Sequence, residues 1–343
     1  MKTKPRNLFI LFLMLSGIAY NSSGQSMHPQ LKMYYNLKNS GDDAIYHDKD
    51  TANALVFYDL AFNLFTANFD SSFCDIVPDL IRFHGYQNNS EKVYKYIRYS
   101  IQVNHTNELP EYYMPSEWNK CKEYTSFRNS KYWQLFVKEH DSLYKAAVSG
   151  LDWKLIYDYI THDRLDHFVR QGELENTRKL SMDSGYNYNK IYFAVVHDID
   201  RYNLLNLARY IKEGHFLNYE ETGGRIGLSN MVLMHTFRSC MEDSSIAWTY
   251  KYIDSALLSK VFAGKYPAAM YAFHKDRSYS YLCRGPQKYG LWSGGTGQII
   301  NGLMDVKNVD AIRAEIGLPC LYIQSLKDGF KLPVGYEVPA KYK

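Results

Sequence analysis

The sequence predicts a mainly α-helical fold, with helical hairpins in its first part and one small β-hairpin in an otherwise helical second part. Apolar side chains recur every three or four residues along most of the chain, which is the period of an amphipathic helix. Capping residues stand before many of these stretches, and glycines follow them. Of the 343 residues, 46% are hydrophobic and 22% are charged, values typical of globular proteins. Disordered and collagen-like chains are therefore excluded.

The first residues have the pattern of an export signal. Basic side chains precede the apolar run 8–15, and small polar residues follow up to Gly24. Ser22 and Gly24 suit the positions before a signal peptidase site, so we expect residues 1–24 to be a signal peptide cleaved before Gln25. The alternative is an uncleaved anchor, but the run is shorter than the roughly 20 apolar residues of a spanning helix. We therefore expect an exported protein, periplasmic or extracellular, without stable membrane insertion after cleavage.

Charge gives no sign of a nucleic-acid partner. Removing residues 1–24 takes away Lys2, Lys4 and Arg6 and no acidic side chain, so the formal net charge falls from +4 to +1. A nucleic-acid interface would need a basic patch or a recognisable module. The near-neutral mature chain has neither pattern, and we expect no nucleic acid among its partners.

No metal or cofactor is expected. The five cysteines include no CxxC pair, and HExxH and P-loop patterns do not occur. His162 and His167 are five residues apart on one expected helix, so their rings diverge by roughly 140° and cannot share a metal. One or two disulfides would suit an oxidising compartment, Cys74 with Cys121 among them. Buried free cysteines are the alternative.

The elements of the first half begin with residues 28–50. This stretch fits either an irregular lead-in or a short first helix, because polar residues and glycine separate its aromatic residues. Regular pattern begins at the cap formed by Asp50 and Thr51. Apolar residues then recur at helical spacing from Ala54 to Phe65, which predicts the first clear helix.

Two more helices follow along the chain. The first passes through Ile81, with Pro78 limiting where it begins and Gly85 ending it, and the second begins at Ser90. The short turn 87–89 between them resembles the helix-turn-helix unit of a tetratricopeptide repeat. The hallmark Trp, Leu-Gly and closing Pro of that repeat are missing, so a generic helical bundle is the alternative.

Helical pattern continues over residues 133–148 and 153–170. We expect residues 25–150 to form an N-terminal, tetratricopeptide-like helical scaffold and residues 151–343 a C-terminal helical domain. No sharp linker separates these parts, and the most boundary-like stretch is the polar segment 171–189, which contains two glycines.

Beyond the helix 153–170, the C-terminal part is expected to hold four helices and the hairpin. The helices share an apolar face and a serine or glycine near one end, and cover residues 201–212, 226–240, 246–258 and 309–316. Residues 287–292 and 298–300 have the pattern of two short strands around the glycine-rich turn 293–297, which predicts a β-hairpin.

Short motifs of the second half follow one another in a defined order. They are Asp200-Arg201-Tyr202-Asn203, Gly227, His235, Asp276-Arg277, the run from Gly285 to Gly290, Asp305, Arg313 and Gly317-Leu318. In this order and spacing, the region from Leu155 to Ser325 resembles the bacterial domain of unknown function 6624. The helical region in front is similar to what precedes this domain in secreted bacterial proteins. The resemblance points to a fold and to residues, and implies no reaction, because the family has no established activity.

The chain departs from that family in two places. Leu291 and Trp292 stand where the family has Thr and Gln, and Asp163, Arg164 and His167 fall where it has an Asp-Gln pair followed by an Arg. Polar groups that would serve a reaction are thereby replaced.

Five side chains of the second half would form a catalytic pocket. His235 lies on an otherwise apolar helix, as either a buried hydrogen-bonding group or a general acid or base. Asp276 and Arg277 would orient this histidine and bind an anionic substrate, or would form an ion pair or a helix end. Gln287 and Tyr289 alternate on the expected strand and would face one side. If the hairpin packs over the helix of His235, all these groups converge.

Two further groups of residues are candidates for ligand binding. Asp200 and Asn203 open a helix and offer polar side chains without a defined partner. Tyr94, Tyr96 and Tyr99 would line a peptide or carbohydrate face by stacking, unless they belong to the helical core.

The sequence therefore favours a protein- or peptide-binding helical scaffold, which needs no reactive group. The alternative is an envelope hydrolase that uses His235, Asp276 and Arg277. A purely structural domain without a ligand is the third interpretation.

Overall fold

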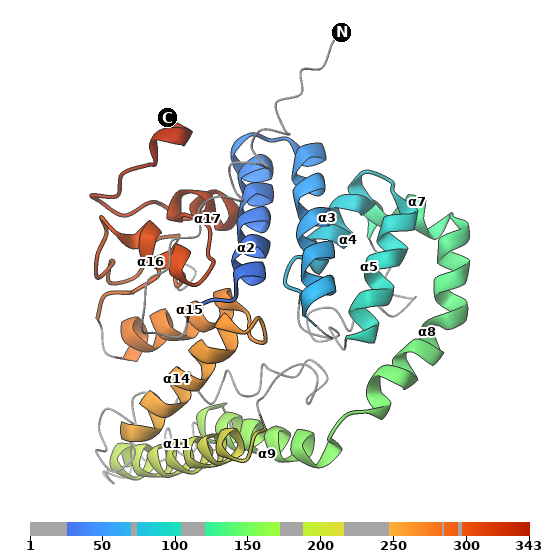
Figure 1. Cartoon of the computed structure of the whole chain (residues 1–343). Coiled ribbons are helices and arrows are strands. Elements are labelled where there is room, and N and C mark those ends of the chain that lie inside the picture. Colours follow the sequence, from blue (N-terminus) through green and yellow to red (C-terminus); the bar gives the residue numbers. More distant parts are fainter. Residues whose placement is uncertain are drawn as a thin grey trace.

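The computed structural model describes residues 26–69, 74–103, 121–171, 188–215, 247–282, 285–293 and 297–343. Its architecture is mainly helical, as the sequence predicts. The helices follow one another around a ring, so that the last of them lie beside the first (Figure 1). No helix in these ranges is both long and apolar enough to cross a bilayer.

The first half is a series of helices in which each main helix packs against the next one along the chain. They are α2 (Pro29–Asp42), a π-helical turn (Asp43–His47), α3 (Thr51–Asn68), α4 (Val77–Tyr86), α5 (Ser90–Gln102), a 3-10 turn (Lys122–Tyr124), α7 (Thr125–Arg128) and α8 (Lys131–Ser149). Of the two alternatives for residues 28–50, the short first helix is therefore confirmed.

Side-chain caps set the beginnings of two of these helices. The Asp50 carboxylate accepts a hydrogen bond from the backbone N–H of Asn53 at 3.0 Å, as the predicted cap of α3 requires. Asn89 caps α5 in the same way, accepting from the N–H of Lys92 at 3.2 Å. Each cap satisfies an N–H group that the helix itself leaves without a partner.

Gly85 has a different role from the predicted one. Helix α4 continues past it to Tyr86. A Cβ atom on Gly85 would lie 2.6 Å from the ring of Tyr124. The glycine therefore allows the 3-10 turn to pack closely against α4, and does not end the helix.

The second half continues around the ring. Its elements are α9 (Trp153–Gln171), α11 (Tyr188–Lys212), α14 (Ala247–Phe262), α15 (Ala268–Arg277), a π-helical turn (Ser278–Leu282), α16 (Val309–Glu315), α17 (Leu321–Asp328) and a 3-10 turn (Ala340–Tyr342). The predicted helices 246–258 and 309–316 match α14 and α16, whereas α15 and α17 were not predicted. The predicted helix 201–212 covers only the second half of α11, which begins at Tyr188, so Asp200 and Asn203 lie within the helix and do not open it. The expected helix 226–240 lies outside the described residues.

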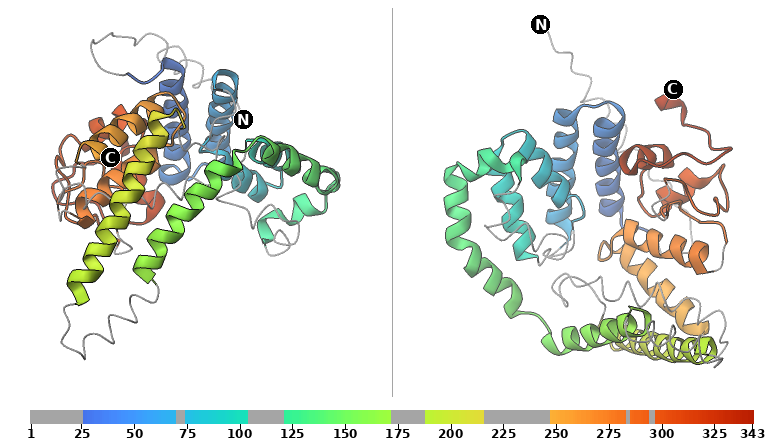
Figure 2. Two further views of the ribbon diagram at one scale, coloured as in Figure 1. Left: turned by 90° about the horizontal axis from the view of Figure 1, so that it is seen from below. Right: turned by 180° about the vertical axis from the view of Figure 1, so that it is seen from behind.

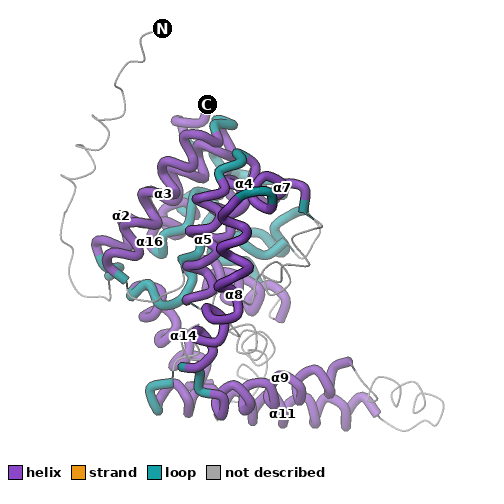
Figure 3. The backbone as a smooth tube through the Cα atoms, turned by 90° about the vertical axis from the view of Figure 1, so that its right-hand side faces the viewer, coloured by secondary structure: helices purple, strands orange, loops and turns teal. Residues whose placement is uncertain are grey.

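Helices α9 and α11 form an arm. They pack against each other along part of their length and extend away from the other helices (Figures 2 and 3). The division of the chain at residue 150 falls just before α9 and stays a prediction.

The predicted β-hairpin is wrong. Among the described residues of this region no strand forms, and Gln287 and Gln298 make only isolated bridges, with Leu303 and Lys331 respectively. One backbone hydrogen bond joins the two expected strands, from the N–H of Ile300 to the C=O of Trp292 at 3.4 Å.

The physical reason is competition for backbone groups. Asp276 accepts the N–H groups of Lys288, Tyr289 and Leu291, and Gln287 bonds both the N–H and the C=O of Trp292. A hairpin ladder would need those same groups, and local side-chain bonds replace it. The centre of the expected turn, residues 294–296, lies outside the described residues.

The C-terminal segment closes the ring against the N-terminal helices. Gly317 has a φ of +87°, and a Cβ atom there would lie 2.3 Å from the ring of Tyr35 on α2, so that glycine alone suits this contact. Lys327 on α17 places its Nζ 3.6 Å from carboxylate oxygens of both Asp42 and Asp79. The first and last helices thus share one packed interface.

The described cysteines are free thiols. Cys74 and Cys121 do not form the disulfide considered from the sequence, and Cys320 is also reduced. Cys74 is fully buried, and burial raises the pKa of its thiol. It is therefore an ordinary core cysteine. Cys240 and Cys283 lie outside the described residues.

Candidate functional site

The structure brings together three of the five residues predicted to form a catalytic pocket. Asp276, at the end of α15, accepts the backbone N–H of Tyr289 in the following loop, and Gln287 bonds the backbone of Trp292 in the same loop. All three side chains are almost completely buried, with relative exposures of 0%, 0% and 2%. Arg277 is half-buried beside them on α15. His235, the predicted acid or base, lies outside the described residues.

Asp276 holds the loop by its backbone. Oδ1 accepts hydrogen bonds from the N–H groups of Lys288 and Tyr289 at 2.8 and 2.9 Å, and Oδ2 accepts from the N–H of Leu291 at 2.8 Å. Burial raises the pKa of Asp276 to about 6, although these three bonds and the nearby Arg313 act to lower it. Both carboxylate oxygens are therefore engaged in shaping the loop.

The side chain of Gln287 also bonds backbone groups of this loop. Its Nε2 donates to the carbonyl oxygens of Trp292 and Ile300 at 2.6 and 2.9 Å, and its Oε1 accepts from the N–H of Trp292 at 3.0 Å. A glutamine amide offers two N–H groups and one oxygen, and all of them have partners here. The side chain therefore has no group left for a substrate.

Arg313 completes this network from α16. The side chain is fully buried and donates to the carbonyl oxygens of Pro319 and Tyr289 at 2.7 and 2.5 Å and to Oε1 of Gln324 at 2.9 Å. Burial lowers the pKa of Arg313 to about 10. One buried network thus joins Asp276, Gln287, Tyr289 and Arg313, which span almost forty positions of the sequence. We call it the Asp276 network.

Asp200 and Asn203 belong to a second buried network, between α9 and α11. Nη2 of Arg170 donates to Oδ1 of Asp200 at 2.6 Å, and Arg170 also pairs with Asp166 one turn earlier on α9. Nδ1 of His162 lies 2.8 Å from Oδ1 of Asn203. These polar groups join the two helices of the arm.

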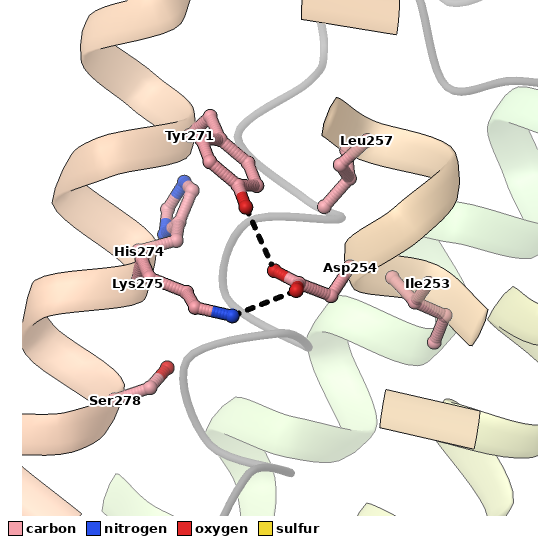
Figure 4. A pocket seen from close by; sticks show the side chains of 7 residues that line it. All are labelled: Ile253, Asp254, Leu257, Tyr271, His274, Lys275 and Ser278. Carbon is pink, nitrogen blue, oxygen red and sulfur yellow. Dashed lines mark hydrogen bonds and ion pairs between the residues drawn. The ribbon is translucent and has the colours of Figure 1, made fainter. Parts of the chain in front are cut away.

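A small cavity lies between α14 and α15 (Figure 4). Tyr271 donates its hydroxyl to Asp254 at 3.1 Å, and Nζ of Lys275 donates to the same carboxylate at 2.7 Å. His274 also lines this cavity and is buried, and neither of its ring nitrogens has a hydrogen-bond partner in the described part of the chain. Burial and the nearby Arg277 lower the pKa of His274 to about 3.

The size of this cavity limits what it can do. Its volume is about 20 Å³, which is room for little more than one water molecule. A neutral, buried histidine has the chemistry of a general base. The cavity, however, leaves no space for a substrate beside that histidine.

An open groove of about 620 Å³ runs along α5. Helix α3 contributes Phe62 and Thr66, α8 contributes Tyr132, and the remaining lining residues come from one face of α5 between Glu91 and Gln102. Its volume falls within the range of ligand pockets, which is roughly 300–1,000 Å³. The groove therefore has the size and the access that a ligand needs. A second open cavity of about 380 Å³, between α2 and the C-terminal segment, also falls in this range, but its lining includes one aromatic ring, that of Tyr342, whereas the groove along α5 has four.

Three cations lie on the α5 face of the groove, one helical turn apart. Lys92 pairs with Asp59 at 3.0 Å, and Arg98 pairs with Glu139 at 2.9 Å. No described carboxylate forms an ion pair with Lys95, between them, whose Nζ donates only to the neutral Asn63 amide at 3.4 Å. Burial and the neighbouring Lys92 lower the pKa of Lys95.

The sequence indicated this site in part. Of the three tyrosines that it singled out on α5, Tyr94 and Tyr99 line the groove, whereas Tyr96 is a buried core residue. The signal for the cations was the three-residue spacing of Lys92, Lys95 and Arg98, which puts them on one helix face. Their pairing with Asp59 and Glu139 depends on the packing of α3 and α8, which the spacing alone does not predict.

Comparisons of this chain with protein-family models, with curated proteins and with solved structures find no match.

Proposed function

We propose that this chain is an exported bacterial binding scaffold, and that its groove along α5 holds a segment of a partner protein or peptide. One observation carries the proposal: the groove is open and lined by aromatic rings, and it contains a lysine that has no carboxylate partner among the described residues. Aromatic contact area with a few polar groups is the usual chemistry of a peptide-binding groove.

The Asp276 network supports this proposal over the hydrolase alternative. A catalytic carboxylate needs a free oxygen within reach of a histidine or a substrate. Both oxygens of Asp276 instead accept backbone N–H groups, and Gln287 has no free polar group. Membership in the bacterial domain of unknown function 6624 is likewise a proposal, which rests on the order of the motifs from Asp200 to Leu318.

The proposal can be tested by blocking the groove with a larger side chain. Mature protein would be used to select peptides from a random display library, and the binding of the selected peptides would be measured by fluorescence anisotropy. Thr66→Trp places a large ring in the groove and should abolish binding. Ala67→Trp adds the same ring at the next, exposed position of α3, which does not line the groove, and should bind like the wild type.

The proposal would be wrong if no peptide were enriched, or if Thr66→Trp bound the selected peptides as well as Ala67→Trp does. Circular dichroism of both variants checks that α3 is intact, since Thr66 bonds only backbone carbonyls of its own helix.

A further inference from the structure

We infer that the groove along α5 recognises an extended peptide in which a carboxylate lies between two apolar side chains, and that Lys95 binds this carboxylate. The inference rests on the proposed function, because it names the chemistry of the segment that the groove holds.

The first argument is the state of the charges around the groove. Asp59 accepts from Tyr96 and pairs with Lys92, and Glu139 accepts from Tyr94 and pairs with Arg98. These two carboxylates already have their counter-charges within the fold. Glu91, which lines the groove at the first turn of α5, accepts a hydrogen bond from the Tyr132 hydroxyl at 3.0 Å.

The cation left over is Lys95. Its Nζ lies 5.0 Å from the ring of Phe62 and 5.2 Å from that of Tyr96, in addition to its contact with Asn63. Lys95 is exposed, so water solvates its charge in the free protein, and the rings and the neutral amide do not neutralise that charge. A carboxylate brought by a partner would supply the missing charge and a charge-assisted hydrogen bond.

The second argument is the aromatic wall on each side of this lysine. On the α3 side, the rings of Phe62 and Tyr99 meet edge to face at 4.9 Å. On the α8 side, Tyr94 and Tyr132 lie 5.7 Å apart. The groove thus presents an aromatic wall, a cation and a second aromatic wall in that order. A ligand with a central negative charge between two apolar groups would match it.

An extended peptide satisfies that order. Side chains of alternate residues face the same way and are roughly 7 Å apart in an extended chain. The sequence apolar-x-acidic-x-apolar therefore presents its three groups to one surface. An acidic polysaccharide is the less suitable ligand, because each of its acidic sugars carries a carboxylate and none has an apolar side chain to place against the two aromatic walls.

The probe is a pair of capped, fluorescein-labelled nonapeptides of Gly and Ser with a central Leu-Ser-Glu-Ser-Phe or Leu-Ser-Gln-Ser-Phe. Wild-type protein should bind the Glu peptide about tenfold more tightly than the Gln peptide, which is the effect of one charge-assisted hydrogen bond. Lys95→Gln should remove this difference, and Lys95→Arg should keep most of it. Lys138→Gln, at an exposed position of α8 outside the groove, is the matched control and should bind like the wild type.

The outcomes separate this inference from the proposed function. If the Glu and Gln peptides bind equally and both are lost in Thr66→Trp, the groove binds peptides but the role of Lys95 is wrong. If neither nonapeptide binds while library-selected peptides do, the inferred pattern is also wrong. If no peptide binds at all, both proposals fail. Lys95-dependent binding of polygalacturonate in place of the peptides would overturn the choice of a peptide ligand.

Discussion

Single polar side chains in the second half act on the backbone. Asp276, Gln287 and Arg313 together engage backbone groups of at least five other residues and bring three segments of the chain into contact. From the sequence alone, a buried aspartate of this kind cannot be told from a catalytic one, because both are surrounded by polar motif residues. The difference lies in which atoms the carboxylate meets, and that depends on the tertiary fold.

Substitution of Asp276 by Asn tests its role. The amide oxygen can still accept from Lys288 and Tyr289, but the amide nitrogen would face the buried N–H of Leu291, where two donors oppose each other. We expect the free energy of unfolding, measured by denaturant titration, to fall by about 2 kcal/mol. Asp141→Asn, at a carboxylate whose side chain is 87% exposed, should change it by less than about 0.5 kcal/mol. Equal effects in the two variants would contradict a structural role for Asp276.

His274 should make the protein sensitive to acid. Its pKa is about 3 in the folded state, against 6.5 ordinarily, so the unfolded chain binds the extra proton between these values. Stability therefore falls as the pH drops below 6.5, by about 1.4 kcal/mol per pH unit from this group. Denaturant titrations should show that His274→Leu loses about 2 kcal/mol less than the wild type between pH 7 and pH 5.

Comparing variant and wild type at each pH isolates this group. Asp276 contributes with the opposite sign, because its pKa is raised to about 6 and stability falls as the pH rises from about 4 to 6. That contribution is the same in both proteins and cancels. His197→Gln, at a half-buried histidine on α11, is the control and should keep the wild-type slope. An unchanged slope in His274→Leu would contradict the buried, unpaired state of His274.

At the scale of elements, helices were predicted better than the loop. The cap at Asp50 and the turn before Ser90 depend on neighbouring residues, and the structure confirms both. The segment 287–300 has strand-like alternation, but its backbone groups are taken by Asp276, which lies more than ten positions earlier. The alternation of residues within a segment cannot indicate that a side chain so far along the chain will bind its backbone N–H groups.

The arm of α9 and α11 is held by a charge network that should not tolerate loss of its cation. Arg170→Met would remove the cation that pairs with both of the buried carboxylates Asp166 and Asp200. We expect a loss of about 3 kcal/mol and faster hydrogen exchange of amides in α9 and α11.

Two further variants make this prediction specific. Adding Asp200→Asn to Arg170→Met should restore part of the protection, because only one buried carboxylate remains. Arg209→Met removes an exposed arginine of α11 whose pairing with Glu213 is long, at 4.0 Å, and should leave exchange unchanged. Exchange rates in Arg170→Met equal to those in Arg209→Met would show that the network does not hold the arm.

At the scale of the whole molecule, the chain ends meet. Lys327 lies between the buried Asp42 and the half-buried Asp79. Although burial lowers the pKa of Lys327, these carboxylates raise it above the ordinary value. We expect Lys327→Met to lower the free energy of unfolding by at least about 2 kcal/mol. Lys341→Met breaks a pair with Asp43 in which the lysine is 62% exposed, and should cost less than about 1 kcal/mol. Similar losses would contradict a buried link between the ends.

The sequence predicted the helical class and most helix positions, because amphipathic period and caps are local signals. It did not predict that α2 packs against α17, since that contact joins residues almost 300 positions apart. The same holds for the candidate site: its local features could be predicted from the sequence, and its long-range pairings could not. The sequence offers the tyrosines on α5 as either a binding face or core residues, and both occur. The isolation of Lys95, by contrast, depends on carboxylates from α3 and α8 that pair with its neighbours.

The most direct test of this account is one set of anisotropy titrations, with a library-selected peptide against wild-type protein, Thr66→Trp and Asp276→Asn under conditions in which all three are folded. The account predicts that Thr66→Trp loses binding while Asp276→Asn, although less stable, binds like the wild type. Loss of binding in Asp276→Asn together with wild-type binding in Thr66→Trp would contradict it, and would place the functional site at the Asp276 network.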